Sequence, residues 1–144
     1  MSDENVEVVR RYFDGWPETD LPALVARFWE SDGDYYPVRG FPEARACHGR
    51  EEIMAFLSDF LAAWEGYGLV VKETRGIGDD RVFVHVRIGA EGRASGAKLE
   101  GDIYICCWLR HGRFIRVEDH LTAKGALHAL GFTGETLEAA GLPE

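Results

Sequence analysis

The fold is decided by residues 82–88, which read VFVHVRI. Apolar β-branched residues occupy every second position, and this period of two is typical of a strand. Residues 98–110 form a second predicted strand, followed by the tight turn His111-Gly112 and a returning strand over 114–121. Two long strands joined by so short a turn indicate an antiparallel hairpin.

Helical periodicity precedes these strands. Residues 6–16 and 21–28 carry apolar side chains at a spacing of three to four, and the clearest helix is predicted over 51–64. Between them, residues 31–34 (SDGD) indicate a turn, and residues 35–38 (YYPV) a short strand that its proline confines to a sheet edge. Helices grouped before a meander predict an α+β fold with the helices on one face of the sheet.

The rest of the chain completes one predicted domain over residues 1–144. A strand is expected to begin at Leu69, after a helix end at Gly66 and Gly68. Residues 89–96 indicate a glycine-rich loop, and residues 123–130 a closing helix. The core is expected to span about residues 5–132, with an acidic C-terminal tail over 133–144.

Composition excludes several classes of function. The chain has 144 residues, 46% of them hydrophobic, and a net charge of −9. So acidic a surface repels phosphate backbones, and we expect no nucleic-acid partner. No apolar run approaches 18 residues, and the polar N-terminus lacks the features of a signal peptide, so we expect no membrane partner and a cytoplasmic location.

The potential metal ligands show no recognised spacing. Three cysteines, Cys47, Cys106 and Cys107, are an odd number and do not suggest a disulfide framework. His85, Asp119 and His120 also lack the spacing of a metal site. We therefore expect neither a metal nor a cofactor.

The chain carries six short motifs: residues 8–13 (VVRRYF), 35–38 (YYPV), 47–53 (CHGREEI), 92–96 (GRASG), 111–115 (HGRFI) and 125–131 (GALHALG). In this order and spacing they resemble the SnoaL-like proteins of the nuclear transport factor 2-like superfamily. The resemblance covers about residues 5–132 and implies a cone, in which a strongly curved, mostly antiparallel sheet wraps around an N-terminal helical layer with a long central helix. The cone is open to a small-molecule pocket, and the resemblance also implies a homodimer formed through the sheet.

Ketosteroid isomerase, a member of this superfamily, is a poor match at its catalytic positions. Tyr12 matches its tyrosine. The position of its carboxylate base, before Pro37, is Tyr36 here, and a phenol is a poor base near neutral pH. The position of its second acid falls near Tyr104 and Ile105, which have no carboxyl group. This chemistry is therefore disfavoured.

Two other members of the superfamily leave acid–base chemistry open. Asp119 matches an aspartate of limonene epoxide hydrolase, and His85 and Arg87 match its arginine and second aspartate. A SnoaL-type cyclase needs a base beside a carbonyl and a donor for the enolate; Asp119 or His85 fits the first role, and Tyr36, Tyr104 or Arg87 the second. We therefore predict Asp119 and His85 as catalytic candidates. The predicted substrate-binding residues are Tyr12, Tyr36, Phe60, Arg87, Tyr104 and Trp108.

Two arguments disagree about which side of the strand over residues 82–88 faces the pocket. Hydrophobic alternation over residues 82–88 would turn His85 and Arg87 away from the pocket, whereas the resemblance turns them inward. We expect them to face inward. Three functions stay open: an enzyme of cyclase, isomerase, dehydratase or epoxide-hydrolase type, a binding module for an apolar metabolite, and a structural homodimer with a vestigial pocket.

Overall fold

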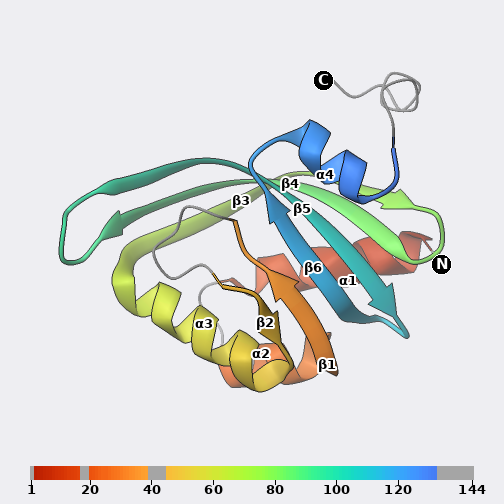
Figure 1. Ribbon diagram of the computed structural model, residues 1–144, viewed down its shortest axis with the longest axis horizontal. Helices are drawn as coiled ribbons and strands as arrows, with labels where there is room; N and C mark the ends of the chain where they lie inside the picture. The colour runs from red at the N-terminus through yellow and green to blue at the C-terminus, as the bar shows by residue number, and fades with distance from the viewer. Residues whose placement is uncertain (1, 17–19, 39–44, 133–144) are drawn as a thin grey trace.

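The structure, a computed structural model, describes residues 2–16, 20–38 and 45–132. Within these ranges, the strands form one curved sheet in the order β2-β1-β6-β5-β4-β3 (Figure 1). β1 and β6 run parallel, and every other neighbouring pair is antiparallel. The strands are β1 (Trp29–Tyr36), β2 (Cys47–His48), β3 (Trp64–Ile77), β4 (Arg81–Gly92), β5 (Lys98–Arg110) and β6 (Arg113–His120).

Helices cover both faces of the sheet, but unequally. α1 (Ser2–Asp14), α2 (Leu21–Phe28) and α3 (Arg50–Ala63) supply side chains to the main core on the concave face. α4 (Ala123–Ala129) packs in a smaller cluster with Phe83 and Cys106 on the other face. The α+β class and the curved sheet are confirmed, and the expectation that the helices lie on one face holds for α1–α3 but not for α4.

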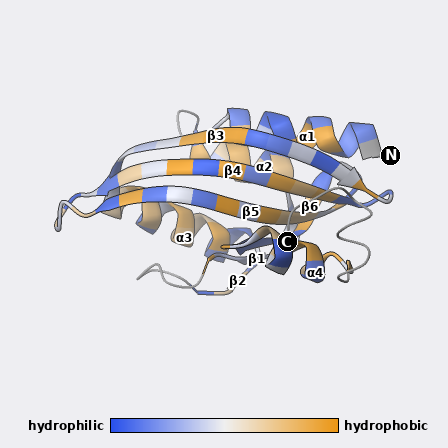
Figure 2. Ribbon diagram, turned by 90° about the horizontal axis from the view of Figure 1, so that it is seen from above, coloured by the Kyte–Doolittle hydropathy of each residue, from blue (hydrophilic) through white to orange (hydrophobic). Residues whose placement is uncertain are grey.

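Alternation along β4 decides which side of the sheet is the core. Val82, Val84 and Val86 are fully buried, and Ile88 nearly so, on the face that packs against α1–α3. Figure 2 shows the corresponding exchange of apolar and polar residues along β3, β4 and β5. Since side chains alternate across a strand, the residues between the valines face the opposite side.

Local signals fix several helix ends. The side chain of Asp20 accepts a hydrogen bond from the backbone N–H of Ala23, as predicted for an N-cap. α3 begins after Gly49, whose φ of +87° a residue with a Cβ rarely adopts. It ends at Trp64, which already has extended backbone angles, so β3 follows without a loop.

Several predictions about where the strands begin and end, and one about the place of β1 in the sheet, are wrong. β1 begins at Trp29 rather than Tyr35, because its pairing with β6 shifts register between Trp29 and Asp34 and so accommodates the polar stretch predicted to be a turn. It lies between β2 and β6, not at an edge, and ends before Pro37. Gly66 and Gly68 lie within β3, which therefore begins at Trp64 rather than at Leu69. Gly89 lies within β4, so the loop predicted over residues 89–96 is shorter than expected. The predicted acidic tail lies outside the described residues.

Candidate functional site

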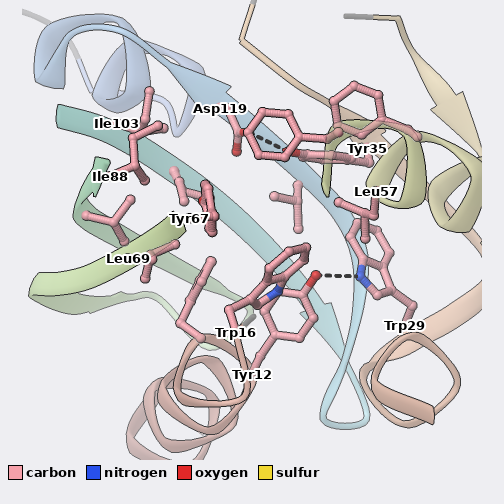
Figure 3. Close-up of a pocket in the computed structure, with 16 residues that line it drawn as sticks. Tyr12, Trp16, Trp29, Tyr35, Leu57, Tyr67, Leu69, Ile88, Ile103 and Asp119 are labelled. Carbon is pink, nitrogen blue, oxygen red and sulfur yellow. Dashed lines mark hydrogen bonds between the residues drawn. The ribbon is translucent and has the colours of Figure 1, made fainter. Parts of the chain in front are cut away.

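A small cavity lies between the helices and the concave face of the sheet (Figure 3). Its volume is about 80 Å³. Aromatic side chains come mainly from the helices and β1, and aliphatic ones mainly from the strands. The residues around it are Tyr12, Phe13, Trp16, Trp29, Tyr35, Phe56, Leu57, Phe60, Tyr67, Leu69, Val86, Ile88, Ile103, Ile105, Val117 and Asp119.

Tyr12 lies at the centre of the aromatic part of this wall. Its ring makes edge-to-face contacts with Trp16, Phe28 and Phe114. Its hydroxyl accepts a hydrogen bond from Trp29 Nε1 at 3.4 Å. Burial raises the pKa of Tyr12 to about 12, so the phenol is neutral at physiological pH.

Asp119 is the carboxylate of the cavity wall. It lies near the end of β6, two residues after Val117, and the period of two places both side chains on the concave face. The hydroxyl of Tyr35 donates a hydrogen bond to Asp119 Oδ2 at 2.5 Å. The parallel pairing of β1 with β6, with Tyr35 opposite Val117, brings the two residues together.

The surroundings of Asp119 shift its titration into the physiological range. Burial among apolar side chains raises the pKa of Asp119 to about 7, and the hydrogen bond from Tyr35 acts in the opposite direction. The pKa of Tyr35 is raised well above its usual value, first by burial and then by the charge of Asp119. Asp119 therefore exchanges a proton near neutral pH while Tyr35 remains a donor, which is the property needed in a general acid or base.

Of the predicted site residues, three line the cavity: Asp119, Tyr12 and Phe60. The expectation that His85 and Arg87 face inward is wrong, because the valines of β4 occupy the concave face. His85 Nε2 lies 2.9 Å from Asp102 Oδ1, and Arg87 donates to Asp102 Oδ2 at 3.3 Å. The structure therefore separates His85 from Asp119 by the thickness of the sheet.

The other predicted residues also lie outside the cavity. Tyr104 stacks on His85 with ring centroids 4.5 Å apart, on the convex face. Tyr36 and Trp108 flank the guanidinium of Arg116, which lies 4.5 and 5.6 Å from their ring centroids. The placement of these residues follows from parity, since each is adjacent in its strand to a residue that packs on the concave side.

Sequence reasoning missed several residues of the site. Tyr35 lines the cavity in place of the predicted Tyr36, because only one of two adjacent strand residues can face it. Trp29 and Tyr67 lie at strand positions where a helix end and a loop were expected. The adjacent residues Tyr35 and Tyr36 were the signal in the sequence, because one of two neighbouring strand residues must face inward.

Within the described ranges, no group of three or more His, Cys, Asp or Glu side chains is arranged to hold a metal ion. No described helix is long and apolar enough to cross a membrane.

Comparison with solved structures identifies the fold class. A protein from a soil-derived mobile gene cassette aligns with a TM-score of 0.76 and 22% identity over 88% of this chain and 95% of its own. A SnoaL-like polyketide cyclase, so described, from Jannaschia sp. aligns with a TM-score of 0.73 and 20% identity over 92% and 94%. A protein of ketosteroid isomerase-like fold from Catenulispora acidiphila, solved with trimethylamine, aligns with a TM-score of 0.68 and 17% identity over 95% and 94%.

These neighbours and the cavity under a curved sheet define a protein of the nuclear transport factor 2-like, or ketosteroid isomerase-like, fold. The SnoaL-like domain family matches residues 9–117. The chain belongs to this family, which confirms the resemblance seen in its motifs. No curated protein matches it in sequence.

Proposed function

We propose that the protein binds a small, largely apolar molecule in the cavity and that Asp119 transfers a proton to or from it without a cofactor. The observation that carries the proposal is a carboxylate with a pKa near 7 in an otherwise apolar wall, oriented by Tyr35. Such a group removes a proton beside a carbonyl or protonates a departing oxygen, as cyclases, isomerases, dehydratases and epoxide hydrolases require. His85 has no part in this chemistry.

Solved neighbours support small-molecule binding in cones of this kind. The Catenulispora acidiphila protein was solved with trimethylamine, and a second neighbour, TerC, was co-crystallised with polyporic acid. The second of these aligns with a TM-score of 0.70 and 22% identity. We extend from them only the expectation that this cone also admits an organic ligand.

The small volume of the cavity favours a second candidate function without catalysis. The protein would then be either a non-catalytic binding module or a structural homodimer with a vestigial pocket. About 80 Å³ is well below the roughly 300–1,000 Å³ of pockets for drug-sized ligands. A large substrate would have to displace aromatic side chains. For the homodimer, the convex face of the sheet offers α4 and the charged group His85, Arg87 and Asp102, and sedimentation at micromolar concentration tests it.

Proton exchange tests the catalytic proposal. Small ketones are incubated with the protein in D₂O, and deuterium uptake beside the carbonyl is followed by NMR. We expect the wild type to accelerate uptake and Asp119→Asn to lose the acceleration. Asp102→Asn, which removes a carboxylate from the convex face, is the matched control and should retain it. Equal acceleration by wild type and D119N would overturn the role of Asp119; binding without acceleration would favour the binding module.

A further inference from the structure

We infer that the cavity selects a small ammonium cation, held by the aromatic wall and paired with the carboxylate of Asp119. The inference rests on the proposed binding function and adds the chemical class of the ligand. Three properties of the cavity support it: its aromatic content, its charge and its size.

Aromatic rings provide half of the cavity wall. Eight of its sixteen residues are Phe, Tyr or Trp. Several of these rings meet edge to face, such as Tyr12 with Trp16 at 72° and Trp29 with Tyr35 at 61°. In an edge-to-face pair the edge of one ring covers the face of the other, so one of the two rings keeps its electron-rich face for other contacts, and such faces attract ammonium groups.

The charges of the wall are one-sided. Among the described residues that line the cavity, Asp119 is the one carboxylate, and none is Lys, Arg or His. A ligand carboxylate or phosphate would therefore enter without a counter-ion and beside a negative charge, which is costly in an apolar site. The net charge of −9 adds an overall attraction for cations.

The size of the cavity restricts the ligand. Its volume of about 80 Å³ is roughly half of the ~150 Å³ known to hold benzene. A methylated amine, with a few heavy atoms around one nitrogen, suits both this volume and the surrounding rings. Larger amines would extend from the cavity or displace side chains.

Pairing with a cation makes binding depend on pH. The titratable groups that act on Asp119, or on which Asp119 acts, are Tyr35 from β1, Tyr12 from α1, Tyr67 from β3, and Cys106 and Cys107 from β5. Burial raises the pKa of all five, so they stay neutral between pH 6 and pH 8. Asp119 is then the group that must lose a proton when the cation binds.

Calorimetry with two matched molecules tests the inference on the full chain. Dimethylammonium and ethanol each have three heavy atoms, as the volume of the cavity allows, but only the first is charged, and its charge does not change between pH 6 and pH 8. We expect dimethylammonium to bind at least about tenfold more tightly than ethanol at pH 8, and its affinity to fall about tenfold between pH 8 and pH 6. At pH 6, repeating the titration in buffers of different ionisation enthalpy should show close to one proton released.

Variants separate the inference from the proposed function. D119N should lose the preference for the cation and the proton release, whereas D102N should keep both. Equal affinity for the two molecules, or cation binding unchanged in D119N, would overturn the inference while leaving the apolar pocket intact. If neither molecule binds and no small ketone exchanges its protons, the proposed function fails as well.

Discussion

The hydroxyl of Tyr35 and the carboxylate of Asp119 form a 2.5 Å hydrogen bond that joins β1 to β6 at the wall of the cavity. Two opposing effects meet at this bond. Burial raises the pKa of Asp119, and the Tyr35 donor lowers it. The balance leaves the carboxyl close to half-ionised at neutral pH, and each side of it can be altered separately.

Removing the donor should raise the pKa of Asp119 further. In Tyr35→Phe the ring remains but the hydrogen bond that stabilises the carboxylate is lost. We expect the titration of the Asp119 side-chain carbon, followed by ¹³C NMR, to move above about 7. Tyr36→Phe removes a hydroxyl from the adjacent residue outside the cavity and serves as control. Equal titration of Asp119 in the two variants would contradict the assigned role of Tyr35.

Neutralising the carboxyl should stabilise the fold at high pH. The pKa of Asp119 is about 7 in the folded state and near 3.8 when unfolded, so the folded state binds more protons between these values. Stability from this group is complete below pH 4 and is lost as the pH rises through 7. Because Asp119 is partly exposed, we expect Asp119→Asn to gain only on the order of 1–3 kcal/mol at pH 8 relative to pH 4.

Chemical denaturation at the two pH values measures this gain. Asp102→Asn is the control of opposite sign, since the hydrogen bond from His85 lowers the pKa of Asp102 and so favours folding at neutral pH. If D119N were less stable than wild type at pH 8, Asp119 would not be a destabilising charge.

Substitution of His85 should leave the cavity unaffected. His85→Asn removes the ring that bonds to Asp102 and stacks on Tyr104, both on the convex face. We expect the pKa of Asp102 to rise toward its usual value, with ligand affinity and proton exchange unchanged. An NMR titration and the deuterium assay check the two halves of this prediction. A large loss of exchange activity in this variant would indicate that His85 takes part in the reaction, and it would contradict the observed facing of β4.

The stability of the fold should depend on Gly33, which lies at the irregular part of the pairing between β1 and β6. A Cβ at this position would lie 2.6 Å from an atom of the Trp29 ring and 3.2 Å from the backbone oxygen of Phe114. Trp29 is 1% exposed, so its ring has little room to move. We expect Gly33→Ala to cost roughly 1–3 kcal/mol in thermal or chemical unfolding. In Gly101→Ala, where the Cβ meets nothing within 4 Å, stability should be unchanged or slightly higher.

Elements with a strong period were predictable from the sequence. Residues 98–110 form β5 as predicted, and α3 matches its predicted span to within one residue at each end. Hydrophobic alternation also predicts the observed facing of β4. The opposite expectation, that His85 and Arg87 face inward, followed from the family resemblance. Where two adjacent positions compete for one role, burial is the better guide, because a one-residue shift moves a side chain through the whole sheet.

The rest of the site depends on contacts that a local pattern does not encode. β1 contains a polar stretch that reads as a turn, and it becomes a strand only because β6 pairs with it. The hydrogen-bond partner of Asp119 could therefore not be predicted from the sequence, since Tyr35 acquires its role from that pairing. The pKa of Asp119 likewise depends on how closely residues from several elements surround it.

The parallel pairing of β1 with β6 also constrains how the chain is assembled. Tyr35 and Asp119 are 84 residues apart, and β2, α3, β3, β4 and β5 are all synthesised between them. During translation, β1 has no partner on its β6 side until about residue 120 has emerged from the ribosome. Contacts so distant in sequence form slowly, because the intervening chain must first lose entropy. The acidic group therefore stays hydrated in the nascent chain and enters the apolar interior only when the sheet is completed.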